Sequence, residues 1–496
     1  MTRSLLARLR AHSGRIVDPA SRRQFLASSL AASAWMLSSR SAFAHAPAPP
    51  AGKSIVVVGA GLSGLACAYE LKLAGYDVRV FEASNRLGGR VRSVADFLPG
   101  RNVEFGGELI GSNHPTWVAY KEKFGLEFLE LSDPKDECFN PFMLGGKVLG
   151  KDECKALDDA VDKAFLALDE DGKRVFVDEP WKTKDAAALD QRSFRDWLDK
   201  LDAPADVKLV LGIEFYANNG QELGKQSYLG NLCSIQGGGG AQKYREESEV
   251  YRCKGGNQSL ARALAKEIGD RVFLEVPVKQ IEQKDKNVVV TGKDGREVEC
   301  DDVVLAVPPT VWDKITFNPG LPAVLKPQMG SNVKYFSGQK QRIWDQKDGF
   351  SQYALADGNV SMTWEGTDKQ EGDGEYCLVA FSGAHAAEAC RALKGKEREL
   401  AYAAELEKLL PGSKANATGK TAFMDWPSEP WTRASYSFPA PGEVTTVGPK
   451  LRDGHGHVHF AGEHCCYKFV GYMEGALNSG AALAQRLAVR DGLLKK

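Results

Sequence analysis

Three common features are scarce in this chain of 496 residues: paired cysteines, an excess of one charge and long apolar runs. The ten cysteines include no CxxC pair and no metal-ligand spacing, so we expect no metal site and mostly buried thiols. The formal net charge is −1 and becomes −7 without residues 1–44, and this mildly acidic balance argues against nucleic acid or an anionic membrane as a partner. The apolar run at residues 25–37 is far shorter than the roughly 20 residues of a spanning helix, so we expect no integral membrane anchor.

The N-terminus has the features of an export signal. Arg22 and Arg23 precede the short apolar run, and residues 42–44 (Ala-Phe-Ala) form an A-x-A end. This order is typical of a cleaved signal peptide, and the twin arginine resembles the Tat type. The alternative is an N-terminal tail with a chance arginine pair. We therefore expect the Tat machinery to export the chain, with residues 1–44 cleaved near Ala44 and a periplasmic or secreted mature protein.

Cleavage would change the charge of the chain. Residues 1–44 contain seven arginines and one aspartate, so their removal changes the formal net charge from −1 to −7. Because Tat cargo is generally folded before export, the cysteines need not be paired despite an oxidising destination.

The first segments of the expected mature chain read as a βαβ unit. Residues 53–58 are a β-branched run, typical of a buried parallel strand, and residues 77–81 form a second strand. A helical pattern at residues 65–74 lies between them. The sequence therefore predicts an α/β fold. Further strand-like segments are residues 272–281, 287–291, 303–307, 332–338, 379–382 and 457–461; helical patterns are residues 152–208 and 475–489, and residues 237–240 read as a flexible glycine loop.

A glycine motif joins the first strand to the first helix. In Gly59-x-Gly61-x-x-Gly64 the first glycine permits the tight turn, the second lets backbone approach a pyrophosphate, and the third allows close packing of helix and strand. Glu82 ends the second strand, where a carboxylate accepts hydrogen bonds from ribose hydroxyls. The sequence therefore predicts a dinucleotide site. An exported protein has little use for an exchangeable coenzyme, which favours a tightly held flavin.

Several further motifs resemble the flavin-dependent amine oxidase superfamily, which includes monoamine oxidases and L-amino-acid oxidases. These are Arg86-Leu87-Gly88-Gly89-Arg90, Gly106-Gly107-Glu108, residues 274–281, residues 303–309 followed by Phe317-Asn318-Pro319, Phe460-Ala461-Gly462-Glu463 and Gly471-Tyr472-Met473-Glu474-Gly475-Ala476. They follow the family order over nearly all of residues 53–490.

This resemblance implies a two-domain architecture assembled from interleaved segments. An FAD-binding, Rossmann-type domain is expected from residues 53–130, 250–315 and 445–490. A substrate domain of mixed sheet plus helices is expected from residues 131–249, which include a helical insertion, and 316–444.

The resemblance also implies which residues bind FAD. Arg90 is expected near the pyrophosphate and flavin, Val278 at the adenine through its backbone, and Glu463 at the ribityl or pyrophosphate region. Gly471 and Met473 are expected to pass beside the isoalloxazine. The full set of expected cofactor-binding residues is Gly59, Gly61, Ser63, Gly64, Glu82, Arg90, Gly107, Val278, Glu463, Gly471 and Met473.

Three residues match the reaction centre of the family. Tyr436 and Tyr472 fit the positions of the two aromatic side chains that flank the substrate nitrogen before the flavin. Such a dry site favours the neutral amine, which has the lone pair that stabilises an iminium. Lys334 matches the lysine that meets flavin N5 through a water. As alternatives, the tyrosines are core aromatics and the lysine lies on an exposed edge strand.

Two departures from the family pattern affect the prediction. Family members with covalent FAD have a cysteine immediately before the first tyrosine, whereas this chain has Ser435, so we expect noncovalent FAD. Cys465 and Cys466 are expected to pack rather than to attach the cofactor.

The second departure concerns the substrate. Many L-amino-acid oxidases place an arginine for the substrate carboxylate shortly after the double glycine, where this chain has Glu108. Arg433 or Lys468 is a candidate replacement, unless they lie on the surface. Alternatively, Glu108 attracts the second ammonium of a polyamine.

The sequence thus predicts an FAD-dependent amine oxidase. It would convert a primary amine or L-amino acid to the imine, and then to an aldehyde or 2-oxo acid plus ammonia, while O₂ becomes H₂O₂ (hydrogen peroxide). The alternatives are a flavin desaturase or dehydrogenase acting on a non-amine substrate, and a catalytically silent flavin-binding protein. The sequence leaves open whether the protein forms a homodimer.

Overall fold

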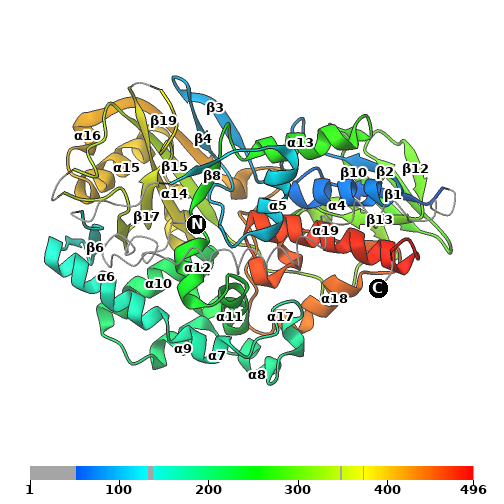
Figure 1. Cartoon of the computed structure of the whole chain (residues 1–496), viewed down its shortest axis with the longest axis horizontal. Coiled ribbons are helices and arrows are strands. Elements are labelled where there is room, and N and C mark those ends of the chain that lie inside the picture. Colours follow the sequence, from blue (N-terminus) through cyan, green and yellow to red (C-terminus); the bar gives the residue numbers. More distant parts are fainter. Residues whose placement is uncertain (1–51, 132–137, 347–348, 373, 495–496) are drawn as a thin grey trace.

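The computed structural model describes residues 52–131, 138–346, 349–372 and 374–494. Two main sheets lie at opposite ends of the view in Figure 1, a parallel sheet on the right and a larger sheet on the left, with a group of helices below. The fold is α/β, as the sequence predicts. The expected signal peptide lies outside the described residues, and the expected domain boundaries stay a prediction.

Five strands form the parallel sheet, in the order β20–β13–β1–β2–β9. The predicted βαβ unit is confirmed, although α4 begins at Leu62, three residues before its predicted start. The five strands come from distant parts of the chain, so this sheet is interleaved in sequence. Their bounds are β1 Ser54–Val58, β2 Asp77–Phe81, β9 Val272–Phe273, β13 Asp302–Leu305 and β20 Val458–Phe460.

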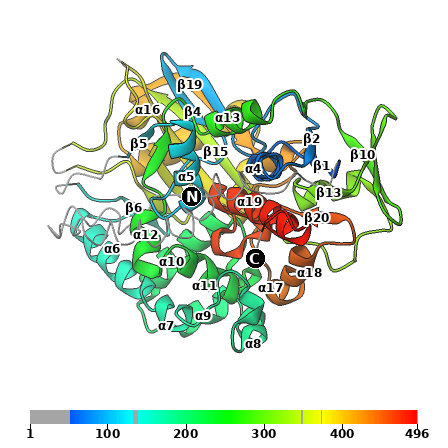
Figure 2. The ribbon, with the colours of Figure 1, turned by 45° about the vertical axis from the view of Figure 1, so that its right-hand side comes forward.

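The buried run of β1 packs on both of its faces. Ile55 and Val57 belong to the core beneath the helices, whereas Val56 and Val58 belong to the core beneath a second sheet. Successive side chains of a strand point to opposite faces, which explains why the run has no polar position. Figure 2 shows the helices α4 and α19 side by side on the first face. The helices of this core are α4 Leu62–Leu73, α5 Pro115–Phe124, α13 Gln258–Ile268 and α19 Met473–Arg490.

The second sheet covers the other face of the parallel sheet. Its order is β12–β11–β10–β14, and Ile281, Val288 and Val290 share a core with Val56 and Val58. Its strands are β10 Val278–Gln283, β11 Val288–Gly292, β12 Glu297–Cys300 and β14 Thr316–Asn318.

The larger sheet has seven strands in the order β19–β15–β18–β17–β16–β6–β7. All eight residues of β15 are buried, and its neighbours β18 and β19 run antiparallel to it. Val333 and Tyr335 pack in one core, whereas Phe336 packs in another, so the intervening Lys334 points to the face of Phe336. The strands are β6 Phe142–Leu144, β7 Lys147–Val148, β15 Asn332–Gln339, β16 Leu355–Ala356, β17 Met362–Glu365, β18 Tyr376–Gly383 and β19 Ala417–Asp425.

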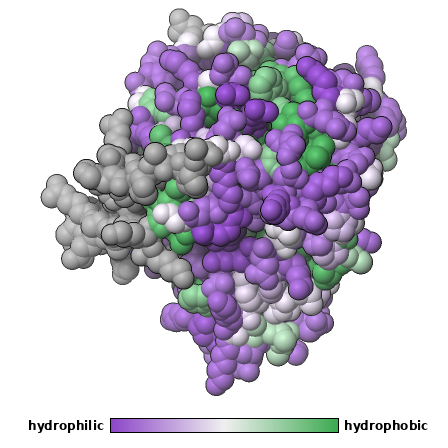
Figure 3. Space-filling view, turned by 90° about the vertical axis from the view of Figure 1, so that its right-hand side faces the viewer, coloured by the Kyte–Doolittle hydropathy of each residue, from purple (hydrophilic) through white to green (hydrophobic). Residues whose placement is uncertain are grey.

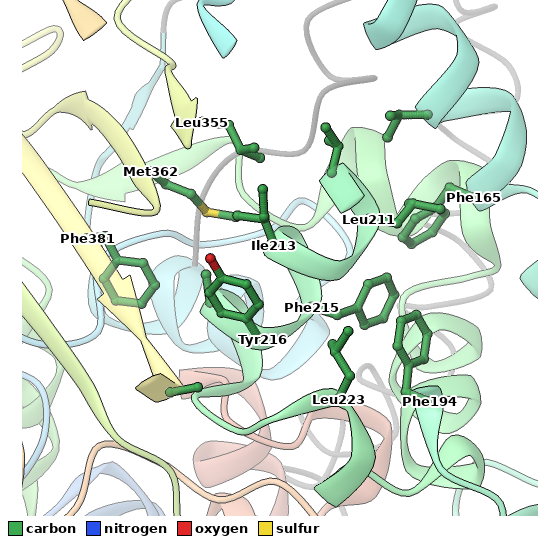
Figure 4. Packing of buried hydrophobic residues seen from close by; sticks show 14 of the residues in the cluster. Phe165, Phe194, Leu211, Ile213, Phe215, Tyr216, Leu223, Leu355, Met362 and Phe381 are labelled. Atoms are coloured by element: carbon green, nitrogen blue, oxygen red, sulfur yellow. The ribbon is translucent and has the colours of Figure 1, made fainter. Parts of the chain in front are cut away.

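Helices cover both faces of this sheet. On one face, helices that follow β18 pack against Val333 and Tyr335. On the other, α10 joins the sheet to the lower helices: Figure 4 shows Phe215 against Phe194, with ring centroids 3.8 Å apart, and Ile213 near Met362 of β17. The helices are α6 Lys151–Phe165, α7 Leu168–Gly172, α8 Ala186–Gln191, α9 Phe194–Lys200, α10 Ala205–Asn219, α11 Tyr228–Gly237, α12 Ala241–Glu247, α14 Ala384–Ala392, α15 Gly395–Leu409 and α16 Ser413–Asn416. The remaining elements include β3 Ser93–Leu98, β4 Arg101–Glu104, β5 Phe128–Glu130, β8 Tyr251–Cys253, α17 Glu443–Thr446 and α18 Gly448–Asp453.

Two sequence-based expectations are wrong in detail. Of the predicted glycine loop, Gly237 is the last residue of α11, and residues 238–240 form the short connection to α12. The segment 272–281 is not one strand: β9 and β10 lie in different sheets. Glu275 between them has a φ of 59°, outside the strand region, and Pro277 has no N–H to donate to a strand ladder.

The surface is mainly hydrophilic on the face shown in Figure 3, with small hydrophobic areas. In the described segments, every helix is too short or too polar to serve as a membrane span.

The contact between α4 and α19 depends on a glycine. A Cβ atom at Gly480 would lie 2.1 Å from the Ser63 carbonyl oxygen. We expect Gly480→Ala to destabilise the protein by about 1–3 kcal/mol through overpacking, although alanine favours helices elsewhere. Gly224→Ala is the control, because nothing lies within 4 Å of its Cβ position. Thermal unfolding of both variants measures the difference, and equal stability would contradict this account of the helix pair.

Candidate active site

One elongated cavity, with a volume of about 230 Å³, extends from the parallel sheet to β15 of the larger sheet. It begins at the carboxyl ends of β1, β2 and β13, where ligands of such sheets bind. With one exception, all residues predicted to serve the cofactor or the reaction line it. These are Gly59, Gly61, Ser63, Glu82, Arg90, Gly107, Val278, Lys334, Tyr436, Glu463, Gly471, Tyr472 and Met473.

The exception is Gly64, which packs helix against strand. A Cβ atom there would lie 2.0 Å from the Gly59 carbonyl oxygen and 3.2 Å from the Ala306 Cβ. This is the close approach that the third glycine of the motif was predicted to permit.

The glycine turn leaves room and donors for a phosphate. Gly59 has a φ of 107°, and a Cβ atom there would lie 2.8 Å from the Ala306 carbonyl oxygen. The helix α4 has no side-chain cap, so the N–H groups of Leu62, Ser63 and Gly64 at its start have no acceptor within the helix. Such a helix N-terminus attracts anions.

Glu82 is fixed beside this turn. It is buried and accepts hydrogen bonds from the Ala60 N–H at 2.8 Å and from the Ser84 hydroxyl at 2.7 Å. These bonds orient a carboxylate on the cavity wall. Its contact with ribose hydroxyls stays a prediction.

Glu463 joins three segments of the cavity wall. One carboxylate oxygen accepts from Arg90 Nη1 at 2.8 Å, and the other accepts from the Ser437 hydroxyl at 2.6 Å and the Gly471 N–H at 2.9 Å. Burial opposes its ionisation, but the charge of Arg90 and these bonds outweigh burial and lower the pKa of Glu463. The carboxylate is thus a structural link in the predicted cofactor site.

Lys334 is held by acceptors at the start of the double-glycine segment. Its Nζ lies 3.1 Å from the Glu104 carbonyl oxygen, 2.9 Å from the Gly106 carbonyl oxygen and 2.6 Å from Glu108 Oε2. These contacts engage as many acceptors as an ammonium has donors. The alternative of an exposed edge-strand lysine is wrong, since Lys334 is buried on an inner strand. Its water contact to a flavin stays a prediction.

Glu108 is also engaged by protein groups. Its Oε1 lies 2.7 Å from Arg252 and accepts from Trp364 Nε1 at 2.8 Å, while Oε2 binds Lys334. Burial raises the pKa of Glu108, but the two cations outweigh this and hold it below its usual value. The suggestion that Glu108 attracts a substrate ammonium is therefore wrong, because its carboxylate is already neutralised by Lys334 and Arg252.

The two predicted tyrosines lie on the same cavity and have fixed hydroxyls. Tyr436 donates to the Asn218 carbonyl oxygen at 2.5 Å, and Tyr472 donates to the Tyr244 hydroxyl at 2.9 Å. Burial raises the pKa of both phenols well above the usual value, so they stay neutral. The ring of Tyr472 also meets His114 edge-on, with centroids 5.2 Å apart.

The serine and the two cysteines considered for cofactor attachment differ in their position relative to the cavity. Ser435 lines the cavity, and its hydroxyl donates to Asn332 Oδ1 at 2.6 Å. Cys465 and Cys466 do not line it, and burial raises the pKa of the Cys466 thiol to about 12. Both observations agree with cysteines that pack.

The two candidate carboxylate partners lie away from the cavity. Arg433 is exposed and pairs with Asp313 at 2.9 Å, and Lys468 pairs with Asp178 at 2.8 Å. The structure does not bring either cation together with Tyr436 and Tyr472.

Sequence reasoning missed His464 on the cavity wall. Its side chain is buried, and neither ring nitrogen has a hydrogen-bond partner among the described residues. Burial lowers the pKa of His464 to about 4, so the ring is neutral at neutral pH. The position of His464 directly after Glu463 in the closing motif could have indicated that it lies on the cavity wall. Arg252 and Trp364 had no such signal, because they meet Glu108 only through the fold.

The fold and cavity define a dinucleotide-binding protein. A sequence model of flavin containing amine oxidoreductases matches residues 62–488, and the chain belongs to this family.

Individual relatives agree with this assignment. The chain is similar to pig "Amine oxidase [flavin-containing] A", with 25% identity over 463 residues, which is 89% of this chain and 86% of the pig protein. It is 26% identical over 474 residues to the "Probable flavin-containing monoamine oxidase A" of Dictyostelium discoideum, covering 89% and 98% of the two chains.

Two solved structures have the same fold. Wild-type putrescine oxidase bound to putrescine has a TM-score of 0.79 and 25% identity, covering 88% of this chain and 99% of that chain. Cyclohexylamine oxidase from Brevibacterium oxydans IH-35A has a TM-score of 0.79 and 26% identity, with the same coverage.

The residues present fit the flavin cofactor that the family implies. The Gly59 turn and the start of α4 suit a pyrophosphate, and Glu82 suits a ribose. The His464 nitrogens offer a hydrogen bond to a polar group that the protein itself does not supply, and a buried polar group without a partner is costly.

We expect His464→Leu to raise the dissociation constant of FAD by about tenfold or more, through loss of this hydrogen bond. Titration of the apoprotein with FAD, followed by quenching of flavin fluorescence, measures it without turnover. His385→Leu, at an exposed histidine paired with Glu222, is the control. An unchanged dissociation constant for His464→Leu would exclude a bond from this ring to the cofactor.

Proposed function

We propose that the protein is an FAD-dependent oxidase of primary amines. The convergence of Lys334, Tyr436 and Tyr472 on the cavity that begins at the glycine turn carries this proposal. One amine, one O₂ and one water would give an aldehyde, ammonia and one H₂O₂. Family membership and the amines named for putrescine oxidase and cyclohexylamine oxidase support it.

The bound flavin would supply the acceptor for the hydride equivalent from the carbon next to nitrogen. Tyr436 and Tyr472 remain neutral. The hydrogen bonds that their hydroxyls donate to Asn218 and Tyr244 fix the orientation of the two rings. Aromatic walls exclude water and disfavour an ammonium, so the substrate binds with its lone pair free. Lys334 would supply a fixed cation on the cavity wall, which would stabilise the negative charge that develops as oxygen is reduced.

Amines are favoured over L-amino acids by the positions of the cations. An α-carboxylate needs a partner near the two tyrosines, and Arg433 and Lys468 are paired elsewhere. Arg90 and Lys334 do line the cavity, but both are engaged by carboxylates, Glu463 and Glu108 respectively. The cavity is also lined by Arg86 and Lys314, whose side chains donate to the backbone carbonyl oxygens of Gly89 and Pro430. The preference for amines rests on the four cations above, which are either paired with carboxylates or lie outside the cavity.

Two further features belong to the proposal. Ser435, in the place of an attaching cysteine, favours noncovalent FAD, and the twin arginine favours export by Tat to the periplasm or beyond. Export of folded cargo would let the cofactor be bound before the protein leaves the cytoplasm.

A peroxide assay of the purified protein tests the function. We expect H₂O₂ with primary amines and little or none with the twenty amino acids. Flavin reduction by a non-amine substrate, without amine turnover, would favour a desaturase or dehydrogenase. Bound flavin that no amine reduces would indicate a silent binding protein.

The role of Lys334 is tested by Lys334→Met. Stopped-flow measurement should show reoxidation of the reduced flavin by O₂ slowed by about 10²-fold, the size of an electrostatic contribution of this kind. Flavin reduction by the amine should change little, because Glu108 keeps Arg252 as a partner. Reoxidation at the wild-type rate would refute this role.

The noncovalent prediction is tested by acid precipitation. We expect the yellow colour to stay in the supernatant, since a serine hydroxyl forms no thioether. Flavin that remained with the pellet would overturn it.

A further inference from the structure

Three buried, charged side chains form a cluster at the Lys334 end of the cavity, and one carboxylate in it serves two cations. Glu108 accepts from Lys334 Nζ at 2.6 Å through Oε2, while its Oε1 lies 2.7 Å from Arg252 Nη2. Lys334 and Glu108 line the cavity. Arg252, on β8, does not line it and is linked to it through Glu108.

The formal charge of this cluster is +1. Lys334 and Arg252 each carry one positive charge. Burial opposes the ionisation of Glu108, but the two cations outweigh burial and lower its pKa, so Glu108 carries one negative charge. Without Arg252, Lys334 and Glu108 would be a neutral pair, as Arg90 and Glu463 are on the same cavity. The excess positive charge of the cluster therefore depends on a residue outside the cavity wall.

One further carboxylate, that of Glu104, adjoins the cluster. Its backbone carbonyl oxygen accepts from Lys334, and its side chain accepts from the Ser93 hydroxyl at 2.9 Å and the Asn257 N–H at 3.0 Å. Burial raises the pKa of Glu104 to about 7, so this side chain is mainly protonated at pH 6. At that pH the cluster keeps its charge of +1.

The hydrogen bonds of Arg252 do not explain why a cation is buried here. Its Nη2 donates to the Glu365 carbonyl oxygen at 2.7 Å and pairs with Glu108, but Nε and Nη1 have no hydrogen-bond partner among the described residues. A buried cation with unmet donors costs free energy, and an apolar side chain of similar volume often stabilises a core as well or better. The charge of Arg252 therefore calls for a reason other than packing.

We propose that Arg252 is a positioning residue for the oxygen half of the reaction: it takes up part of the charge of Glu108, so that Lys334 presents an uncompensated positive charge to the cavity. This inference rests on the proposed oxidase function and extends it to a residue outside the cavity wall.

In this half of the reaction, reduced flavin (FADH₂) gives two electrons and two protons to O₂, and FAD and H₂O₂ result. Negative charge develops on oxygen when electrons arrive ahead of protons. A net positive charge on the cavity wall stabilises that charge, whereas a neutral ion pair stabilises it much less. Arg252 acts on this step only through Glu108 and Lys334.

The test removes the charge of Arg252 and keeps much of its bulk. We expect Arg252→Met, reduced by light without oxygen and then mixed with O₂ at pH 6, to be reoxidised about tenfold more slowly than the wild type. The midpoint potential of the bound flavin should also fall, because a positive charge favours the electron-rich reduced form. This second readout is an equilibrium and needs no turnover. Arg252→Lys keeps the charge and should keep most of the rate.

Unfolding temperatures separate charge from structure. Arg252→Met leaves Glu108 paired with Lys334, so its unfolding temperature should stay close to the wild-type value or rise. Arg342→Met is the matched control, because Arg342 pairs with the buried Glu365 at 2.7 Å and neither residue lines the cavity. That change should lower the unfolding temperature and leave both reoxidation and the midpoint potential unchanged.

Two results would overturn the inference: reoxidation of Arg252→Met at the wild-type rate, or an equal loss of rate in Arg252→Lys. If Arg252→Met does not bind flavin, Arg252→Gln makes the same comparison, since it keeps an N–H donor for Glu108 without the charge. It should slow reoxidation to the same extent, and a wild-type rate there would equally refute the role.

Reduction by light distinguishes failure of this role from failure of the proposed function. If no amine yields H₂O₂ but reoxidation of the photoreduced flavin depends on the charge at position 252, the amine oxidase function fails and the role of Arg252 stands. If amines are oxidised and all variants are reoxidised alike, the role of Arg252 fails and the amine oxidase function stands.

Discussion

The ion pair between Arg90 and Glu463 holds the site together. Arg90 follows the β1–α4–β2 unit, and Glu463 comes from the loop after β20, more than 300 residues later in the chain. Through the same carboxylate, Glu463 fixes Ser437 and Gly471, the residues that adjoin the two tyrosines. A single buried carboxylate therefore sets the relative positions of the cofactor turn and the substrate walls. Such a pair is costly to break, because Glu463 alone would be left charged and buried, while Arg90 is only half-buried.

Local signals accounted for much of the fold. The strands at residues 53–58 and 77–81 and the glycine turn were predictable, because backbone conformation there depends on neighbouring residues. The break between β9 and β10 was less visible, since it depends on which sheet each half joins. The short strands β16 and β17 were missed because they give too little pattern: β16 has two residues, and β17 alternates apolar and polar residues over only four, all of them buried.

The site residues also fall into two groups, those that could be predicted from local sequence and those that could not. Motif residues such as Gly59, Glu82 and Tyr472 could be named because their order along the chain identifies the family. The environment of Lys334 could not, since Glu108 contacts Lys334, and Arg252 contacts Glu108, only through tertiary packing. That packing changed the interpretation of Glu108. The sequence suggested a partner for a substrate ammonium, whereas the structure shows a buried counter-charge to Lys334 and Arg252.

Tyr472 immediately precedes α19, and α19 packs directly on α4. The wall that carries Tyr472 and the helix whose start would receive the phosphate are therefore in direct contact. A cofactor bound at the start of α4 would stabilise this wall through α19. Cofactor loading would then be a maturation step for the substrate pocket as well as for the redox centre.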